Sequence, residues 1–165
     1  MSTTRALLKS LLVTSLIAIT AQSQAEIFEL NLPQTTPEET YDGRMILVLA
    51  SNNEKLPINQ VSADFDAAQI FGVNVDGLQR GKSVEIGANV LGFPTRSLSE
   101  IPAGEYYVQA VLHKYETFNL SNGKTVKLPA ARGAGQNWRK EPGNLLSEPL
   151  KINFDPANQG TIKIE

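Results

Sequence analysis

The sequence predicts an all-β fold, an antiparallel β-sandwich of about seven or eight strands with immunoglobulin-like or related topology. Short apolar stretches recur along the chain at the spacing of such strands, and turn residues such as glycine, proline and asparagine stand between them. The chain has no cysteine, so a packed core and not a set of disulfides must stabilise it. An apolar content of 41% is compatible with such a core.

The first 25 residues have the pattern of a secretory signal peptide. Arg5 and Lys9 precede the apolar run of residues 11–21, and a small-residue cleavage site follows at Ala25. A membrane anchor is the alternative, but the unbroken apolar stretch is shorter than the roughly 20 residues that span a bilayer. We therefore expect cleavage after Ala25, no stable membrane anchor after cleavage, and a periplasmic or extracellular protein.

Residues 26–165 have the length of a single domain with its own core. The formal net charge of the whole chain is −2, and loss of Arg5 and Lys9 takes it to −4. A mildly acidic domain without a run of Lys or Arg lacks the basic patch that phosphate binding needs. We therefore do not expect nucleic acid as a partner.

The expected strands differ in how clearly the sequence marks them. Residues 45–50 form an uninterrupted apolar run, which is typical of a strand that lies centrally and is buried on both faces. In residues 105–117, apolar side chains share one face, and Gln109, His113 and Tyr115 share the other. The expected strands are, in chain order, residues 26–32, 44–51, 69–74, 82–86, 105–117, 125–128, 149–154 and 160–165.

Two turns have a recognisable chemistry. Tyr106 begins a strand after a Pro-x-Gly turn, so we expect its hydroxyl to bond to nearby backbone, as a corner tyrosine does. Ser121, Asn122 and Gly123 form a hairpin-type turn into residues 125–128, which predicts an antiparallel pair on either side of it.

Four segments resemble, in the same order, parts of the N-terminal β-sandwich region of a group of secreted bacterial esterase-like proteins. They are residues 42–48, 71–78, 101–112 and 138–155. In that group an α/β-hydrolase-type domain follows this region and carries the nucleophilic serine, whereas this chain ends at Glu165 and has no Gly-x-Ser-x-Gly elbow. The resemblance implies the accessory domain without the catalytic one.

Catalysis and metal binding find little support in the sequence. A serine hydrolase would need His113, the one histidine, as its base, yet a lone histidine within a strand is usually a half-exposed strand residue. Without cysteine and with one histidine the chain cannot build the usual zinc sites, and we expect no cofactor. Calcium bound by Asp64 and Asp66, or by Asn74 and Asp76, stays open, although turn stabilisation explains the same residues.

The most suggestive surface lies in the long loop of residues 129–147. Trp138 stands there between Asn137 and Arg139, and Tyr107 and Tyr115 are expected to face outward on the preceding strand. Such a group can stack on a sugar ring or anchor a partner protein. In the other interpretation, Trp138 folds back over the open end of the sandwich.

We therefore predict an exported, non-catalytic binding or accessory module that recognises a polysaccharide or a protein such as a secreted hydrolase. One alternative is an accessory partner of a separately encoded esterase-type hydrolase. Another is a structural protein that self-associates through an exposed strand edge, with residues 26–32 or 160–165 as the edge.

Overall fold

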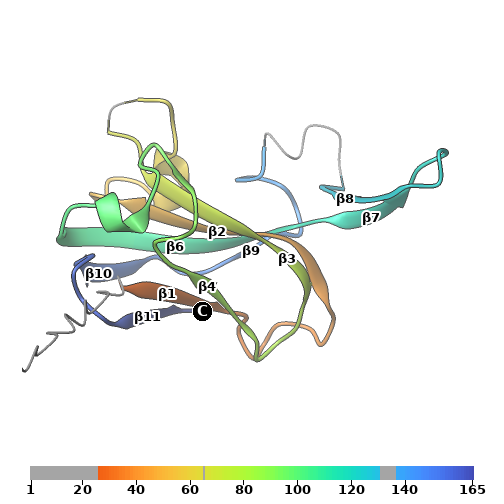
Figure 1. Ribbon diagram of the computed structural model, residues 1–165, viewed down its shortest axis with the longest axis horizontal. Coiled ribbons are helices and arrows are strands. Elements are labelled where there is room, and N and C mark those ends of the chain that lie inside the picture. The colour runs from red at the N-terminus through yellow and green to blue at the C-terminus, as the bar shows by residue number, and fades with distance from the viewer. Residues whose placement is uncertain (1–25, 65, 131–136) are drawn as a thin grey trace, which may run out of the picture.

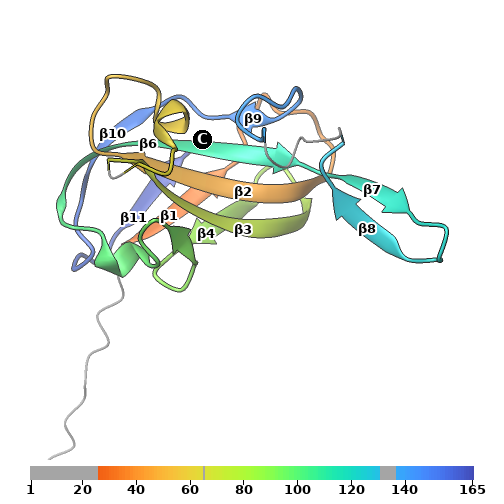
Figure 2. The same ribbon diagram turned by 90° about the horizontal axis from the view of Figure 1, so that it is seen from above.

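The computed structural model describes residues 26–64, 66–130 and 137–165. In these residues two β-sheets pack face to face and a β-hairpin projects from one end (Figure 1, Figure 2). The prediction of an antiparallel β-sandwich is confirmed. The described residues form eleven strands instead of the expected seven or eight, because β5, β7 and β9 are short strands that the sequence analysis did not separate.

The strands are distributed as follows. The smaller sheet has the order β11–β1–β4, with β1 at Ile27–Asn31, β4 at Ser83–Ile86 and β11 at Thr161–Ile164. The larger sheet has the order β10–β6–β2–β3–β5, with β2 at Tyr41–Ala50, β3 at Gln69–Leu78, β5 at Gly92–Phe93, β6 at Gly104–Lys114 and β10 at Leu150–Phe154. Strand β9 (Leu145–Leu146) also pairs with β6, and β7 (Glu116–Asn119) pairs with β8 (Thr125–Leu128). Two short 3-10 helices are η1 at Pro57–Gln60 and η2 at Leu98–Glu100.

The smaller sheet corrects one alternative from the sequence. Strand β1 lies between β11, to which it is parallel, and β4, to which it is antiparallel. Its backbone is therefore paired on both sides, and the first strand has no free edge for self-association. Strand β11 is an edge strand of this sheet, so the last strand keeps that possibility.

The core lies between the two sheets. Strand β2 directs Met45, Leu47 and Leu49 toward the smaller sheet, where β1 presents Phe28 and Leu30. The central position of β2, between β3 and β6, explains why its apolar run is buried on both faces, as predicted. On β6, Val108, Ala110 and Leu112 also belong to this core, which confirms the expected face of that strand.

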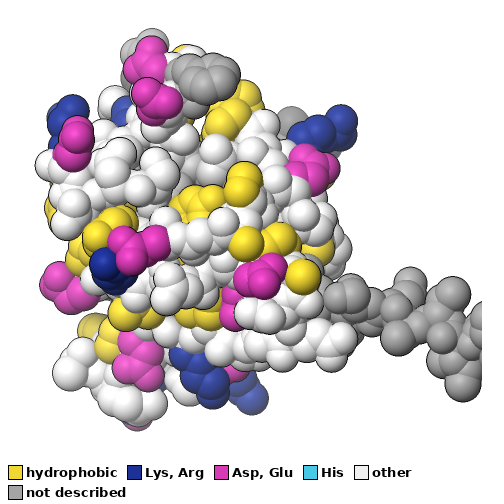
Figure 3. Space-filling view, turned by 90° about the vertical axis from the view of Figure 1, so that its left-hand side faces the viewer, with side chains coloured by type: hydrophobic (Ala, Val, Ile, Leu, Met, Phe, Trp, Pro, Cys, Tyr) yellow, Lys and Arg dark blue, Asp and Glu magenta, His cyan; other side chains and the backbone are white. Residues whose placement is uncertain are grey.

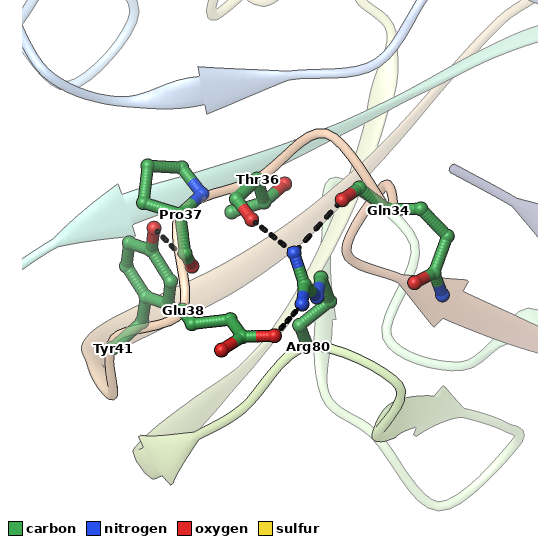
Figure 4. Close-up of polar contacts among 6 residues, drawn as sticks. All are labelled: Gln34, Thr36, Pro37, Glu38, Tyr41 and Arg80. Carbon is green, nitrogen blue, oxygen red and sulfur yellow. Dashed lines mark hydrogen bonds and ion pairs between the residues drawn. The ribbon is translucent and has the colours of Figure 1, made fainter.

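Polar contacts to backbone hold the strand entrances in place. The hydroxyl of Tyr106 donates to the carbonyl of Pro102 at 2.9 Å, so the predicted corner tyrosine is confirmed. Tyr41 makes the same contact with Pro37 at the start of β2 (Figure 4). Figure 4 also shows Arg80 reaching across to the segment between β1 and β2. Its guanidinium donates to two carbonyls of that segment and pairs with Glu38, which holds the segment against the turn after β3.

The β7–β8 hairpin projects beyond both sheets (Figure 1, Figure 2). Its turn is the one predicted, and Gly123 takes a positive φ of 80° there. The expected long strand of residues 105–117 is divided in two: β6 ends at Lys114 and β7 begins at Glu116, and the amide of Tyr115 between them donates to the carbonyl of Asp42. At the base of the hairpin the ammonium of Lys127 pairs with Asp42, at 2.8 Å, and with Asp76.

Acid should weaken this anchor of the hairpin. Hydrogen bonds from Lys127 and from the amide of Gly77 hold the pKa of Asp42 below its ordinary value of 3.8. Because the folded pKa is depressed, the stability that Asp42 contributes is fully present above its unfolded pKa and is lost as the pH falls through the folded pKa. We expect the free energy of urea unfolding to fall more steeply below pH 3.8 in the wild type than in Asp42→Asn, whose amide oxygen still accepts from Gly77. Equal slopes in the two proteins would contradict this prediction.

The surface at the end of the sandwich formed by β10 and the start of β6 carries interspersed charged and hydrophobic side chains (Figure 3). Lys and Arg side chains stand there in separate groups among acidic ones.

None of the helical segments in the described part of the chain is long and apolar enough to span a membrane.

Candidate ligand-binding cleft

The outer face of the larger sheet is arranged in rows by the register of its strands. Because side chains alternate along a strand, Arg44, Ile46 and Val48 of β2 point away from the main core. Arg44 pairs with Asn74 on β3 and with His113 on β6, so three polar residues stand side by side across the sheet. The next row, centred on Ile46, is apolar.

One half of this outer face is covered. The segment after β2, with η1, packs Ile58 and Ala68 onto Ile46, Val48 and Val111 to form a second small core, and Trp138 packs against its side. The other half is open and forms a cleft of about 380 Å³. Its lining includes the side chains of Arg44, Leu91, Phe93, His113, Tyr115 and Trp138.

Arg44 lies flat across β3 at the polar end of the cleft. Its Nη1 donates to the side-chain oxygen of Asn74 at 2.8 Å, and its Nη2 donates to the carbonyl of Gly72 at 2.7 Å. A Cβ atom on Gly72 would lie 2.9 Å from Nε of Arg44. The absence of a side chain at Gly72 therefore makes the room in which the guanidinium lies.

His113 is a buried member of the cleft wall, which corrects the expectation of a half-exposed strand residue. Its side chain is 3% exposed, and the ring of Tyr115 packs edge-on against it with centroids 5.3 Å apart. Burial lowers the pKa of His113 below 6.5, against a smaller opposing effect of Glu141, so the imidazole is neutral at pH 7. Its Nε2 has no hydrogen-bond partner among the described residues, and a polar atom left in this state costs about 1–3 kcal/mol.

Backbone contacts place Trp138 beside the cleft. The side chain of Asn144 donates to the carbonyl of Trp138 at 2.6 Å and accepts from the amide of Lys114 at 3.0 Å. Asn144 therefore ties the loop to the end of β6. Trp138 is half-buried against the outer face of the larger sheet and does not close an end of the sandwich between the sheets.

The five residues named from the sequence do not form one group. Tyr115 and Trp138 meet in the cleft. Arg139 is exposed and donates to the carbonyl of Val61, and Asn137 is exposed, so neither lines the cleft. Tyr107 lies near the opposite end of β6, where the ammonium of Lys151 stands 5.8 Å from its ring centroid. Residues 131–136 of the predicted binding loop lie outside the described residues.

Of the six cleft side chains named above, four were not among the predicted binding residues: Arg44, Leu91, Phe93 and His113. For Arg44 a signal exists in the sequence, because alternation along β2 puts it on the face opposite the main core. Leu91 and Phe93 lie at the two-residue strand β5, which has no periodicity to detect.

Two kinds of catalytic arrangement are not found among the described residues of the cleft. His113 pairs with no serine or carboxylate among the described residues, so the hydrogen-bonded base that a serine nucleophile requires is not assembled there. No group of three or more metal-ligating His, Cys, Asp or Glu side chains occurs in the described ranges, including the segments considered for calcium.

The fold and the cleft define a β-sandwich with an aromatic and polar cleft on the outer face of its larger sheet. Comparison with family models, with curated proteins and with solved structures finds no match for this chain.

Proposed function

We propose that this chain is an exported, non-catalytic binding module that holds a saccharide in the cleft of the larger sheet. The observation that carries this proposal is the combination of three aromatic side chains, from Phe93, Tyr115 and Trp138, with the guanidinium of Arg44 in one cleft. Aromatic faces pack against the apolar faces of sugar rings, and polar groups beside them bond to ring hydroxyls. A volume of about 380 Å³ falls within the range of small-molecule sites.

Export is supported by the signal-peptide pattern of residues 1–25. Glu26, which follows the expected cleavage site, is buried, and its carboxylate accepts a hydrogen bond from the amide of Asp155 at 3.2 Å. The folded body thus includes the residue that cleavage after Ala25 would make the first one. Intact-mass measurement on chain purified from the exported fraction of an expressing cell tests this part of the proposal, because retention of residues 1–25 would contradict it.

Trp138 provides a built-in reporter for the binding test, since it is the single tryptophan of the chain. The purified chain is titrated with a panel of neutral and acidic oligosaccharides, and the fluorescence of Trp138 is followed. We expect at least one saccharide to change the fluorescence, and Tyr115→Ala to weaken its binding about ten-fold, the equivalent of roughly 1.4 kcal/mol.

Tyr107→Ala is the matched control, because it removes the same side chain from the same face of the sheet but outside the cleft. It should bind as the wild type does. The proposal fails if no saccharide affects Trp138, or if the two tyrosine variants lose binding equally.

A second candidate function, contact with a protein such as a separately encoded hydrolase, is favoured by the rim of the cleft. Leu91 is 70% exposed and Phe93 is 56% exposed, and exposed aromatic side chains such as that of Phe93 are enriched in protein interfaces. Retention of one hydrolase from the exported fraction by the wild-type chain, and its loss with Phe93→Ala, would favour this function over the first.

A further inference from the structure

We infer that the saccharide unit in the cleft carries a carboxylate group and that Arg44 binds it. This inference rests on the proposed saccharide-binding function and adds the chemical class of the sugar, an acidic one such as a uronic acid. It is carried by the charge of Arg44, by the donors that this side chain leaves free, and by the neighbours of the guanidinium.

Arg44 has no counterion among the residues that the structure describes. All 17 Asp and Glu residues of the chain lie among the described residues. The ion pairs of these residues involve Arg80 and four lysines and leave out Arg44. A half-buried guanidinium without a carboxylate partner retains a full positive charge at the wall of the cleft. Although the chain as a whole has a net negative charge, this uncompensated positive charge favours an anion at the wall of the cleft.

Hydrogen bonds hold the guanidinium in place and leave some of its N–H donors unused. Of its five N–H groups, two are used by Asn74 and by the carbonyl of Gly72. The remaining three have no acceptor among the described residues. Because two hydrogen bonds already fix the plane of the group, little side-chain freedom is left to lose on binding, and a planar carboxylate suits the remaining donors.

The neighbours of Arg44 favour an acidic sugar over other carboxylates. Tyr115 and Trp138 supply aromatic surface on which the ring of a sugar can pack. Glu141, whose charge acts on His113, does not line the cleft and does not pair with Arg44.

The test compares three probes on the purified full chain in its exported form: oligogalacturonate, the same oligomer with its carboxylates methyl-esterified, and polyglutamate. Binding is followed by Trp138 fluorescence and by calorimetry. We expect free oligogalacturonate to bind at least about ten-fold more tightly than its ester, the effect of one charge-assisted contact. In Arg44→Gln this preference for the free acid over the ester should disappear. Lys82→Gln, which removes an exposed cation outside the cleft, should behave as the wild type does.

Gly72→Ala is the second variant, because its added methyl group would displace the guanidinium without removing the charge. It should also lose the preference, and it keeps the test decisive if Arg44→Gln does not fold. Equal binding of acid and ester by the wild type, or an unchanged preference in the Arg44 and Gly72 variants, would overturn this inference alone and leave the binding module in place. Polyglutamate binding as tight as that of oligogalacturonate would overturn the sugar assignment. No response to these probes or to any neutral saccharide would overturn the proposed function itself.

Discussion

Replacement of Gly43 by alanine is expected to lower the free energy of unfolding by about 3 kcal/mol or more. A Cβ atom at this position would lie 2.1 Å from the carbonyl oxygen of His113, a distance at which either β2 or β6 must move. Neither can move freely, because β2 is paired on its other side with β3, where Gly43 lies opposite Val75. Urea unfolding followed by circular dichroism measures the loss.

Gly104→Ala is the control for this prediction. Gly104 likewise lies in a strand of the larger sheet, β6, but a Cβ atom there would come no closer than 3.7 Å to another atom, on the ring of Tyr106. Its replacement should change the stability by no more than about 0.5 kcal/mol, as surface substitutions usually do. If Gly43→Ala were as mild as Gly104→Ala, the close approach of β2 to β6 would be wrong.

Gly43 also matters for the cleft. The register between β2 and β3 shifts between Tyr41 and Gly43, and Arg44 follows directly after this irregularity. A slip of one residue would turn every later side chain of β2 to the opposite face. The position of Arg44 on the outer face thus depends on the same small residue that allows the strands to approach.

The sequence predicted the individual strands far better than their partners. Alternation and apolar runs depend on residues next to one another in the chain, and they located β1, β2, β6 and β10 closely. The parallel pairing of β1 with β11 joins residues more than 130 positions apart, at Ile27 and Thr161. No local pattern encodes that pairing, so neither the order of strands nor the central place of β1 could be predicted.

The candidate site shows the same limit. Tyr107 and Tyr115 were grouped because they share a face, but at roughly 3.3 Å per residue of extended chain they lie about 26 Å apart. His113 was expected at a half-exposed surface because alternation distinguishes two faces without telling which of them is covered. The outer face is partly covered here by η1 and by Trp138, which only the folded chain brings together.

Replacement of Phe154 by alanine is the second large effect that we expect, a loss of about 3–5 kcal/mol in the free energy of unfolding. Phe154, at the end of β10, is 1% exposed and stacks on Phe28 of the smaller sheet with ring centroids 5.7 Å apart. It also meets Tyr106 edge-on at 6.3 Å. Removal of its ring would open a cavity between the two sheets and remove a contact that joins them. The loss of stability should therefore exceed the free energy of transferring one phenylalanine side chain from the core to water.

Phe93→Ala is the matched control for this prediction. It removes the same type of side chain from the rim of the cleft, where 56% of the residue is exposed. It should cost no more than about 0.5 kcal/mol of stability. Since Phe93 lines the cleft and Phe154 does not, Phe93→Ala should weaken binding of any saccharide that alters Trp138 fluorescence. Phe154→Ala, at temperatures where it remains folded, should bind normally. If both variants lost stability equally, the two-sheet core would be wrong, and if both lost binding equally, the cleft would not be a separate site.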